Sequence, residues 1–288
     1  MTRSRLGWRL ILTEGGLGDF VASTAVPREL HRVNPLEPIE IILPRSREIY
    51  DHNPHVITRP TNPRIVHVEL ERDGEVGNIP YSLCRQIGIS PIDTTPEIFL
   101  TPAERLRGLR LIRSTQRLII AIDTGARGAN RRWIHERWCE VARRLMEKYL
   151  VVEVGSSSND IDELPDRGGR IPCGRSYLDK LDVRETASLV SRCDLMLCMD
   201  SGSSHLAASV GTPQVVIYSR SVWYSRSYWN TTPIFPDVDC YGYSCARRCL
   251  NGIGAHCLVS VTPDRVLDTV RLALARYPSR LLASPRPR

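Results

Sequence analysis

The sequence predicts an α/β protein built on parallel sheets, and two observations carry this prediction. Apolar runs without polar alternation recur along the chain, as in Leu195–Met199, and such runs are typical of strands covered on both faces. Helix-like segments separate these runs, and repeated strand–helix alternation favours parallel sheets. At 288 residues the chain is long enough for two domains of ordinary size.

Residues 1–115 are predicted to form a compact first domain. Its strands are expected at Arg9–Thr13, Ile39–Leu43 and Ile65–Leu70. Its helices are expected after Asp19, around Tyr81–Gln86 and at Ala103–Arg113. Pro27 should kink or break the first helix, because proline lacks the N–H that a helix interior needs.

Residues 116–280 are predicted to form a second domain of the same kind. Its strands are expected at Leu118–Ile122, Leu150–Val154, Leu195–Met199 and Val215–Tyr218. Its helices are expected at His135–Lys148, Arg184–Ser191, His205–Val210 and Pro263–Arg276, the last with Thr262 as N-cap. The basic tail 281–288 is expected to be disordered.

A Gly/Ser-rich turn beginning at Asp200 links a buried strand to a short helix of small residues. Such a turn at a helix start leaves backbone N–H groups without partners, and these groups bind phosphate. Its serines add hydroxyl donors, its glycine permits close approach, and its histidine can donate a further hydrogen bond. An ordinary crossover turn explains the local residues equally well. The predicted anion-binding residues are Ser201, Gly202, Ser203, Ser204 and His205.

A second glycine-rich turn follows the first predicted strand and contains Gly16, Gly18 and Asp19. Asp19 is expected at or near the N-cap of the next helix, where a carboxylate accepts backbone N–H bonds and suits the helix dipole. By its local residues alone, Asp19 is more easily explained as a cap than as a general base.

A third loop follows the strand that ends at Ile122 and reads DTGARGANRRW. The loop combines small residues with cations, among them Gly125, Arg127 and Arg131. Arginine offers a bidentate fork to a phosphate. A solvated basic loop is the alternative.

The three motifs together resemble glycosyltransferase family 9, the heptosyltransferases. DSGSSHLAASVGTP, from Asp200, resembles the family signature D-[ST]-G-x-x-H-L-A-A-x-x-G-T-P, and the turn ending at Asp19 resembles its G-x-G-D. Arg131 falls on the family's Lys position before Trp133, and Ile134 replaces the following Pro. The resemblance implies the GT-B architecture, two Rossmann-like domains with parallel sheets and a cleft between them.

The resemblance also implies an activity and residue roles. The enzyme would transfer a sugar, usually heptose from ADP-heptose, to an acceptor hydroxyl of a glycan or protein. Asp19 would be the general base, while Arg131 and the turn from Ser201 to His205 would hold the donor diphosphate. No catalytic metal is expected at the diphosphate. The remaining candidates, near the cleft or on its loops, are Gly16, Gly18, Gly125, Arg127 and Asp200.

Four of the nine cysteines cluster in a C-x4-C-x3-C-x7-C segment. In a reducing compartment, four thiols in so short a loop suggest one structural zinc or iron ion, with disulfides or free thiols as alternatives. The segment resembles the four-cysteine iron site of autotransporter heptosyltransferases in place and count. The predicted ligands are Cys240, Cys245, Cys249 and Cys257.

The net charge of +7 and pI of about 9.1 suit anionic partners: a nucleotide sugar, a phosphorylated glycan, a membrane surface or nucleic acid. Residues 219–229 interleave arginine with Trp and Tyr, a composition that suits stacking on sugars or bases as well as a packed surface loop. No apolar run approaches the roughly 20 residues of a membrane span. The apolar N-terminal stretch is interpreted as a first strand and not as a signal peptide. We therefore expect a cytoplasmic protein, with peripheral membrane association and the oligomeric state left open.

Two other functions fit the sequence. One is a non-catalytic nucleotide-sugar-binding protein. The other is a glycosyltransferase that acts on modified nucleic acid, for which the basic charge and the Arg/aromatic stretch are suited.

Overall fold

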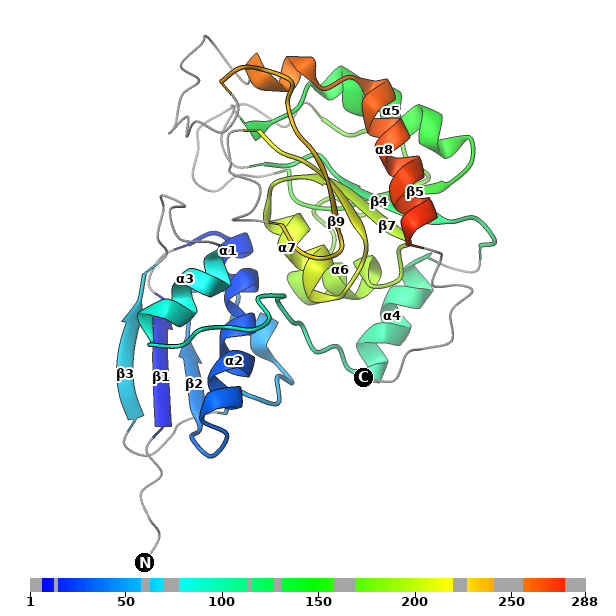
Figure 1. Cartoon of the computed structure of the whole chain (residues 1–288). Coiled ribbons are helices and arrows are strands. Elements are labelled where there is room, and N and C mark those ends of the chain that lie inside the picture. The colour runs from blue at the N-terminus through cyan, green and yellow to red at the C-terminus, as the bar shows by residue number, and fades with distance from the viewer. Residues whose placement is uncertain are drawn as a thin grey trace, which may run out of the picture.

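The computed structural model describes residues 7–12, 15–57, 63–69, 78–112, 115–126, 131–157, 169–219, 227–240 and 256–277. Within these ranges the chain forms two sheets of parallel strands flanked by helices (Figure 1). The predicted α/β class with parallel sheets is therefore confirmed. No helix of the described chain is long and apolar enough to cross a membrane.

The first sheet has three strands in the order β2-β1-β3. These are β1 (Gly7–Leu12), β2 (Ile39–Ile42) and β3 (Pro63–Val68), all close to their expected positions. The helices around this sheet are α1 (Leu17–Ser23), α2 (Ala25–Val33) and α3 (Ile79–Gln86). The expected helix break is present, but it lies at Thr24, so that Pro27 falls in the first turn of α2.

The second sheet has six strands in the order β6-β5-β4-β7-β8-β9. They are β4 (Ile119–Asp123), β5 (Leu150–Glu153), β6 (Arg175–Ser176), β7 (Leu195–Met199), β8 (Gln214–Ile217) and β9 (Thr231–Ile234). Strands β6 and β9 were not expected from the sequence. The first is only two residues long, and β9 contains Pro233, which an edge strand tolerates because one side of its backbone makes no ladder bonds.

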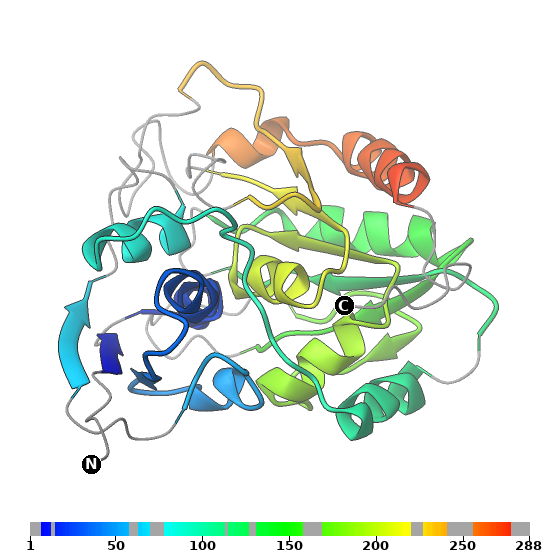
Figure 2. The same cartoon turned by 60° about the horizontal axis from the view of Figure 1, so that its bottom comes forward.

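Helices cover both faces of the second sheet (Figure 2). One face packs against α5 (His135–Met146) and α8 (Pro263–Arg276), and the other against α6 (Val183–Val190) and α7 (Gly202–Ser209). The predicted start of α8 is confirmed, because the Thr262 side chain accepts a hydrogen bond from the Arg265 N–H at 3.3 Å. The short 3₁₀ helices η1 (Arg47–Tyr50) and η4 (His256–Ser260) complete the described secondary structure together with α4 (Pro102–Ile112).

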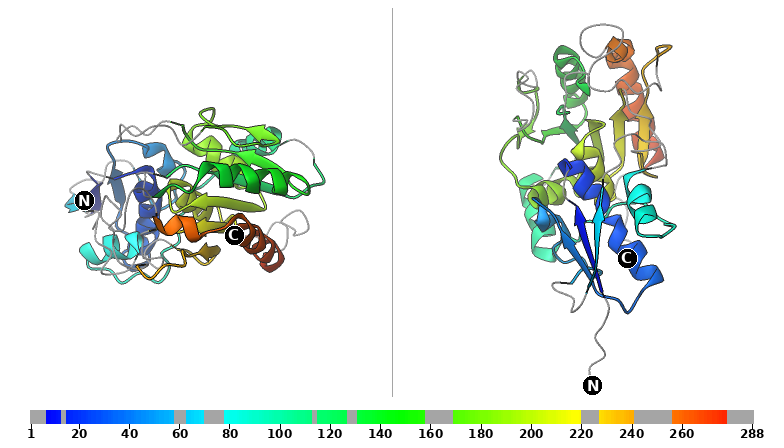
Figure 3. Two further views of the ribbon diagram at one scale, coloured as in Figure 1. Left: turned by 90° about the horizontal axis from the view of Figure 1, so that it is seen from above. Right: turned by 90° about the vertical axis from the view of Figure 1, so that its left-hand side faces the viewer.

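Alternate residues of the central strands enter two separate hydrophobic cores. Ile120 and Leu197 face the core beneath α5 and α8. Ala121 and Met196 face the other core, which is continuous with buried residues of the first sheet and with Phe20 of α1. One apolar core therefore extends from the first sheet to the second, and α1 lies at their junction (Figure 3).

Helix α4 packs on the second sheet's helix α6, although the sequence places it in the first domain. The Gly108 N–H donates to Ser188 Oγ at 3.1 Å, and Ser188 Oγ donates to the Glu104 carbonyl. A Cβ at Gly108 would overlap the Ser188 backbone, so glycine is required for this approach. The domain division at residue 115 stays a prediction. We call the first sheet with α1, α2, α3 and η1 the first body, and the second sheet with its helices, including α4, the second body.

An ion pair between Arg184 and Glu104 joins the same two helices. Arg184 donates to both carboxylate oxygens of Glu104, at 2.6 and 2.9 Å. The hydrogen bonds from Arg184, together with those from Thr101, lower the pKa of the Glu104 carboxyl from its ordinary value of 4.5 to about 2. The charged carboxylate therefore stabilises the folded state.

We expect this carboxylate to contribute to acid stability. Because its folded pKa is depressed, its contribution is present above about pH 4.5 and is lost as the pH falls towards 2. Glu104→Gln should remove this pH-dependent contribution, which amounts to at most roughly 3 kcal/mol. Urea unfolding between pH 2 and 7 measures it. Parallel pH profiles for the two proteins would contradict the expectation.

Candidate functional site

The glycine turn after β1 starts α1 and sets the position of Asp19. Gly16 is the N-cap, so Asp19 occupies the third helical position and lies near the N-cap rather than on it. Its Oδ2 accepts a hydrogen bond from the Gly16 N–H at 2.7 Å. The carboxylate thus satisfies one of the unpaired backbone donors at the helix start.

The predicted anion-binding turn is shorter than expected. Helix α7 begins at Gly202 rather than at His205, with Ser201 as an extended N-cap residue. Serine suits the start of a helix as well as a turn, and this explains the difference. Ser204 is fully buried, and its hydroxyl donates to the Ser201 carbonyl at 2.8 Å.

The first turns of α1 and α7 contact each other, and glycine permits the contact. A Cβ at Gly18 would lie 2.8 Å from Cδ2 of His205 and 3.1 Å from Cα of Gly202. A larger residue at Gly18 would therefore separate the two helices. Because the contact joins both N-terminal turns, two positive ends of helix dipoles lie side by side.

A buried carboxylate at the end of β4 joins this arrangement. The Asp123 side chain accepts a hydrogen bond from the Gly125 N–H at 2.8 Å and another from Ser203 Oγ. Asp123 is buried. It orients Ser203 in the first turn of α7, although no sequence motif marked it as a site residue. Its position directly after a buried strand was the available signal.

Arg131 and Asp200 form a second buried contact beside α7. An Arg131 nitrogen lies 3.0 Å from Oδ2 of Asp200 and also donates to the Asp200 carbonyl. The exposed fractions of the two side chains are 12% and 1%. Arg131 is therefore held next to Ser201, where the family resemblance places a diphosphate-binding cation.

His205 is buried and contacts Tyr228. Its Nδ1 lies 2.5 Å from the Tyr228 hydroxyl, and the two rings meet edge to face. Tyr228 therefore orients the imidazole. Tyr228 belongs to the Arg/aromatic stretch, but the sequence did not single it out.

The structure thus brings the α1 turn together with the α7 turn, Gly125 and Arg131. Arg127, Cys245 and Cys249, and residues 220–226 of the Arg/aromatic stretch, lie outside the described residues. Within the described ranges, no group of three or more His, Cys, Asp or Glu side chains is placed to hold a metal ion. Cys240 and Cys257 are both partly exposed.

The geometry of the site places a proton acceptor close to the backbone N–H groups of a helix start and to a cation, which suit an anion. The carboxylate of Asp19 lies on one helix start, and Ser203, His205 and Arg131 gather at the other. A carboxylate can accept a proton from a hydroxyl. Prearranged donors and a cation stabilise negative charge on a leaving group.

Comparison with known proteins defines the class. Residues 83–231 match the model of glycosyltransferase family 9 (heptosyltransferase), which is more than half of the chain. The chain therefore belongs to glycosyltransferase family 9.

One relative in sequence is lipopolysaccharide heptosyltransferase 2 of Salmonella typhimurium. It is 28% identical over 174 residues, which cover 56% of this chain and 48% of the relative. The chain therefore spans about half the length of the relatives that it matches.

Solved structures share the fold. The glycosyltransferase family 9 protein of Veillonella parvula has a TM-score of 0.70 at 14% identity, covering 95% of this chain and 99% of that one. The iron-containing heptosyltransferase TibC, solved in complex with ADP-D-beta-D-heptose, has a TM-score of 0.71 at 18% identity, covering 95% and 78%. The expected GT-B type of fold is therefore confirmed.

We expect the Gly18 contact to be sterically limited. Gly18→Ala should lower the free energy of unfolding by about 2 kcal/mol, because the new methyl group meets the His205 ring and the Gly202 backbone. Gly202→Ala is the matched control, since its Cβ would make only ordinary contacts at 3.4 Å and beyond. Urea unfolding compares the two variants. Equal stabilities would show that the two helices separate without cost.

Proposed function

We propose that this protein transfers a sugar, heptose from ADP-heptose, to a hydroxyl group of a glycan or protein acceptor. The observation that carries the proposal is the contact between α1 and α7, which brings the turn with Asp19 to the serine-rich turn of the other sheet. Membership of glycosyltransferase family 9 supports the reaction class. The TibC complex with ADP-D-beta-D-heptose supports the donor.

In this proposal Asp19 is the general base. Its carboxylate takes the proton from the acceptor hydroxyl while the acceptor oxygen bonds to the anomeric carbon of the sugar. The bond between that carbon and the diphosphate breaks, and the negative charge stays on the diphosphate. The hydrogen bond from the Gly16 N–H to Oδ2 fixes the carboxylate.

The departing diphosphate is proposed to bind at the start of α7. Gly202 lets the ligand approach the backbone, Ser203 is oriented by Asp123, and His205 is oriented by Tyr228. Asp200 holds the guanidinium of Arg131 beside this turn. The cation and the helix N-terminus supply positive charge without a catalytic metal. The further proposed members are Ser201, Ser204, Gly16, Gly18, Gly125 and Arg127.

A cytoplasmic location fits the proposal. The buried Cys84 and Cys198 are free thiols, and free thiols are typical of a reducing compartment. The acceptor is proposed to be a saccharide such as a lipopolysaccharide core, because the relatives are lipopolysaccharide heptosyltransferases.

Asp19→Asn tests the reaction. Asparagine retains an oxygen that can accept the Gly16 N–H but loses the basicity, so turnover should fall by roughly two to four orders of magnitude. ADP release from ADP-heptose, with truncated lipopolysaccharide as acceptor, measures turnover. ADP affinity by calorimetry should stay close to that of the wild type.

Asp264→Asn is the matched control, since this exposed aspartate lies on α8 and pairs with Arg144. It should turn over like the wild type. Near-normal turnover of Asp19→Asn would return Asp19 to a capping role. A wild-type protein that binds ADP-heptose without turnover would support a binding protein instead.

A structural metal ion on Cys240, Cys245, Cys249 and Cys257 is proposed as well. Two of these thiols lie at the ends of the segment 240–257, and hydrogen bonds hold these ends together. The Asp237 N–H donates to Ser260 Oγ, and Ser260 Oγ donates to the Cys257 carbonyl, both at 2.8 Å. Four thiolates are a common ligand set for zinc or iron, and the bound ion would have a structural role without taking part in sugar transfer. The iron in TibC supports it.

We expect about one zinc or iron ion per chain in the purified protein. Cys257→Ser should lose the metal, because it removes one of four thiolates. Cys139→Ser is the control, since this thiol lies on α5 beside His135. Elemental analysis of the three proteins measures the metal. A metal-free wild type with disulfides between the four cysteines would refute the site.

A further inference from the structure

Arg184 of α6 lies where the two sheets and the linker between them meet. It is buried, with an exposed fraction of 8%. All five N–H donors of a guanidinium have acceptors here. Two donate to Glu104, one to the Phe99 carbonyl at 2.7 Å, and two to the carbonyls of Glu48 and Asp51 at 2.9 and 3.3 Å.

These acceptors belong to three different parts of the chain. Glu48 lies in η1, and Asp51 is the residue directly after η1; both belong to the part of the chain that forms the first sheet. Glu104 lies on α4. Phe99 lies on the linker between the sheets. Arg184 itself belongs to the second body, so a single side chain ties that body to both the linker and the first body.

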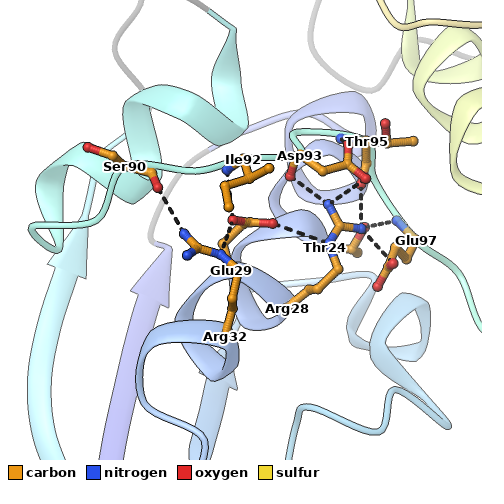
Figure 4. A network of polar contacts seen from close by, with 9 residues as sticks. All are labelled: Thr24, Arg28, Glu29, Arg32, Ser90, Ile92, Asp93, Thr95 and Glu97. Atoms are coloured by element: carbon orange, nitrogen blue, oxygen red, sulfur yellow. Dashed lines mark hydrogen bonds and ion pairs between the residues drawn. The ribbon is translucent and has the colours of Figure 1, made fainter.

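The linker changes partners next to this arginine. Residues 90–97 are held to α2 by a network of Arg28, Glu29 and Arg32 (Figure 4). The Glu97 N–H donates to Thr24 Oγ1 at the end of α1, whereas the Ile98 N–H donates to the Ser209 carbonyl at the end of α7. The junction between the bodies therefore lies between Glu97 and Ile98, and Arg184 holds the next residue, Phe99.

The contact at η1 reaches the helix that carries Asp19. The hydroxyl of Tyr50, in η1, lies 2.7 Å from Ser23 Oγ, and both residues are buried. Ser23 is one helical turn after Asp19 on α1. A displacement of η1 would therefore be passed to α1, while the α7 turn would stay with the second sheet.

We propose that Arg184 is a positioning residue that sets α1 and its Asp19 relative to the diphosphate-binding turn of α7. This inference rests on the proposed function. Lysine cannot replace arginine here, because an ammonium group has three donors and no planar fork for a carboxylate. A reacting group that is misplaced by 1 Å can lose about 100-fold in rate.

The test compares Arg184→Gln with Arg107→Gln. Arg107 is an exposed residue that joins the same two helices, since it pairs α4 with Glu185 of α6. Arg184→Gln leaves the negative charge of Glu104 without its partner cation. The double variant Arg184→Gln/Glu104→Gln removes both charges and is therefore tested as well. All variants are studied well below their unfolding temperature, with rates expressed per folded molecule.

For Arg184→Gln and for the double variant Arg184→Gln/Glu104→Gln we expect kcat for ADP release from ADP-heptose to fall about 10- to 100-fold. Their ADP affinity should stay within about twofold of the wild type. Arg184→Lys should recover only part of this loss. Amide hydrogen exchange in η1, the linker and α1 should increase, while β4 and β7 stay protected. Arg107→Gln should match the wild type in every measurement.

An unchanged kcat for both Arg184 variants would overturn the inference, because a residue that only adds stability leaves the folded enzyme's rate intact. Wild-type protein that releases no ADP would overturn the proposed function instead. In that case amide hydrogen exchange tests, without any measurement of activity, whether Arg184 positions α1. Faster exchange in α1 of the Arg184 variants supports it, and exchange like that of Arg107→Gln refutes it.

Discussion

The site depends on the close approach of α1 and α7. Gly18 and Gly202 have no side chains of their own, so the two helix backbones meet closely, and the His205 ring packs against Gly18. The contact joins helices that follow strands of different sheets. Without it, Asp19 and the serine-rich turn would lie on the edges of two different sheets, and the two parts of the proposed site would be apart.

The close approach of α1 and α7 has an electrostatic cost, and it also creates a region that favours an anion. Two helix N-termini of like sign repel each other, and nearby carboxylates offset the repulsion. Asp19 bonds to the backbone of its own helix start, Asp123 to Ser203, and Asp200 to Arg131. An anionic diphosphate would complement the same ends, so the arrangement that holds the free protein together also favours the proposed ligand.

Local patterns predicted most of the fold, because parallel strands leave continuous apolar runs such as Leu195–Met199. The motifs also located the start of α1, but they placed the start of α7 at His205 instead of Gly202. The sequence could not show that Gly18 faces Gly202, that Asp123 orients Ser203, or that α4 packs on α6. These are contacts between residues distant in the chain, and each depends on how two helices or a strand and a helix meet. Edge strands such as β9 carry too few apolar residues to be recognised.

The apolar core that runs through both sheets has a consequence for folding. Phe20 of α1 and Met196 of β7 belong to one continuous cluster, so separating the two bodies would expose a large part of the interior to water. Relative motion of domains is the usual expectation only where the interface between them is small and polar. This protein should therefore unfold in a single cooperative transition, and the first half, whose buried residues belong to the shared core, should not remain folded when it is produced without the second.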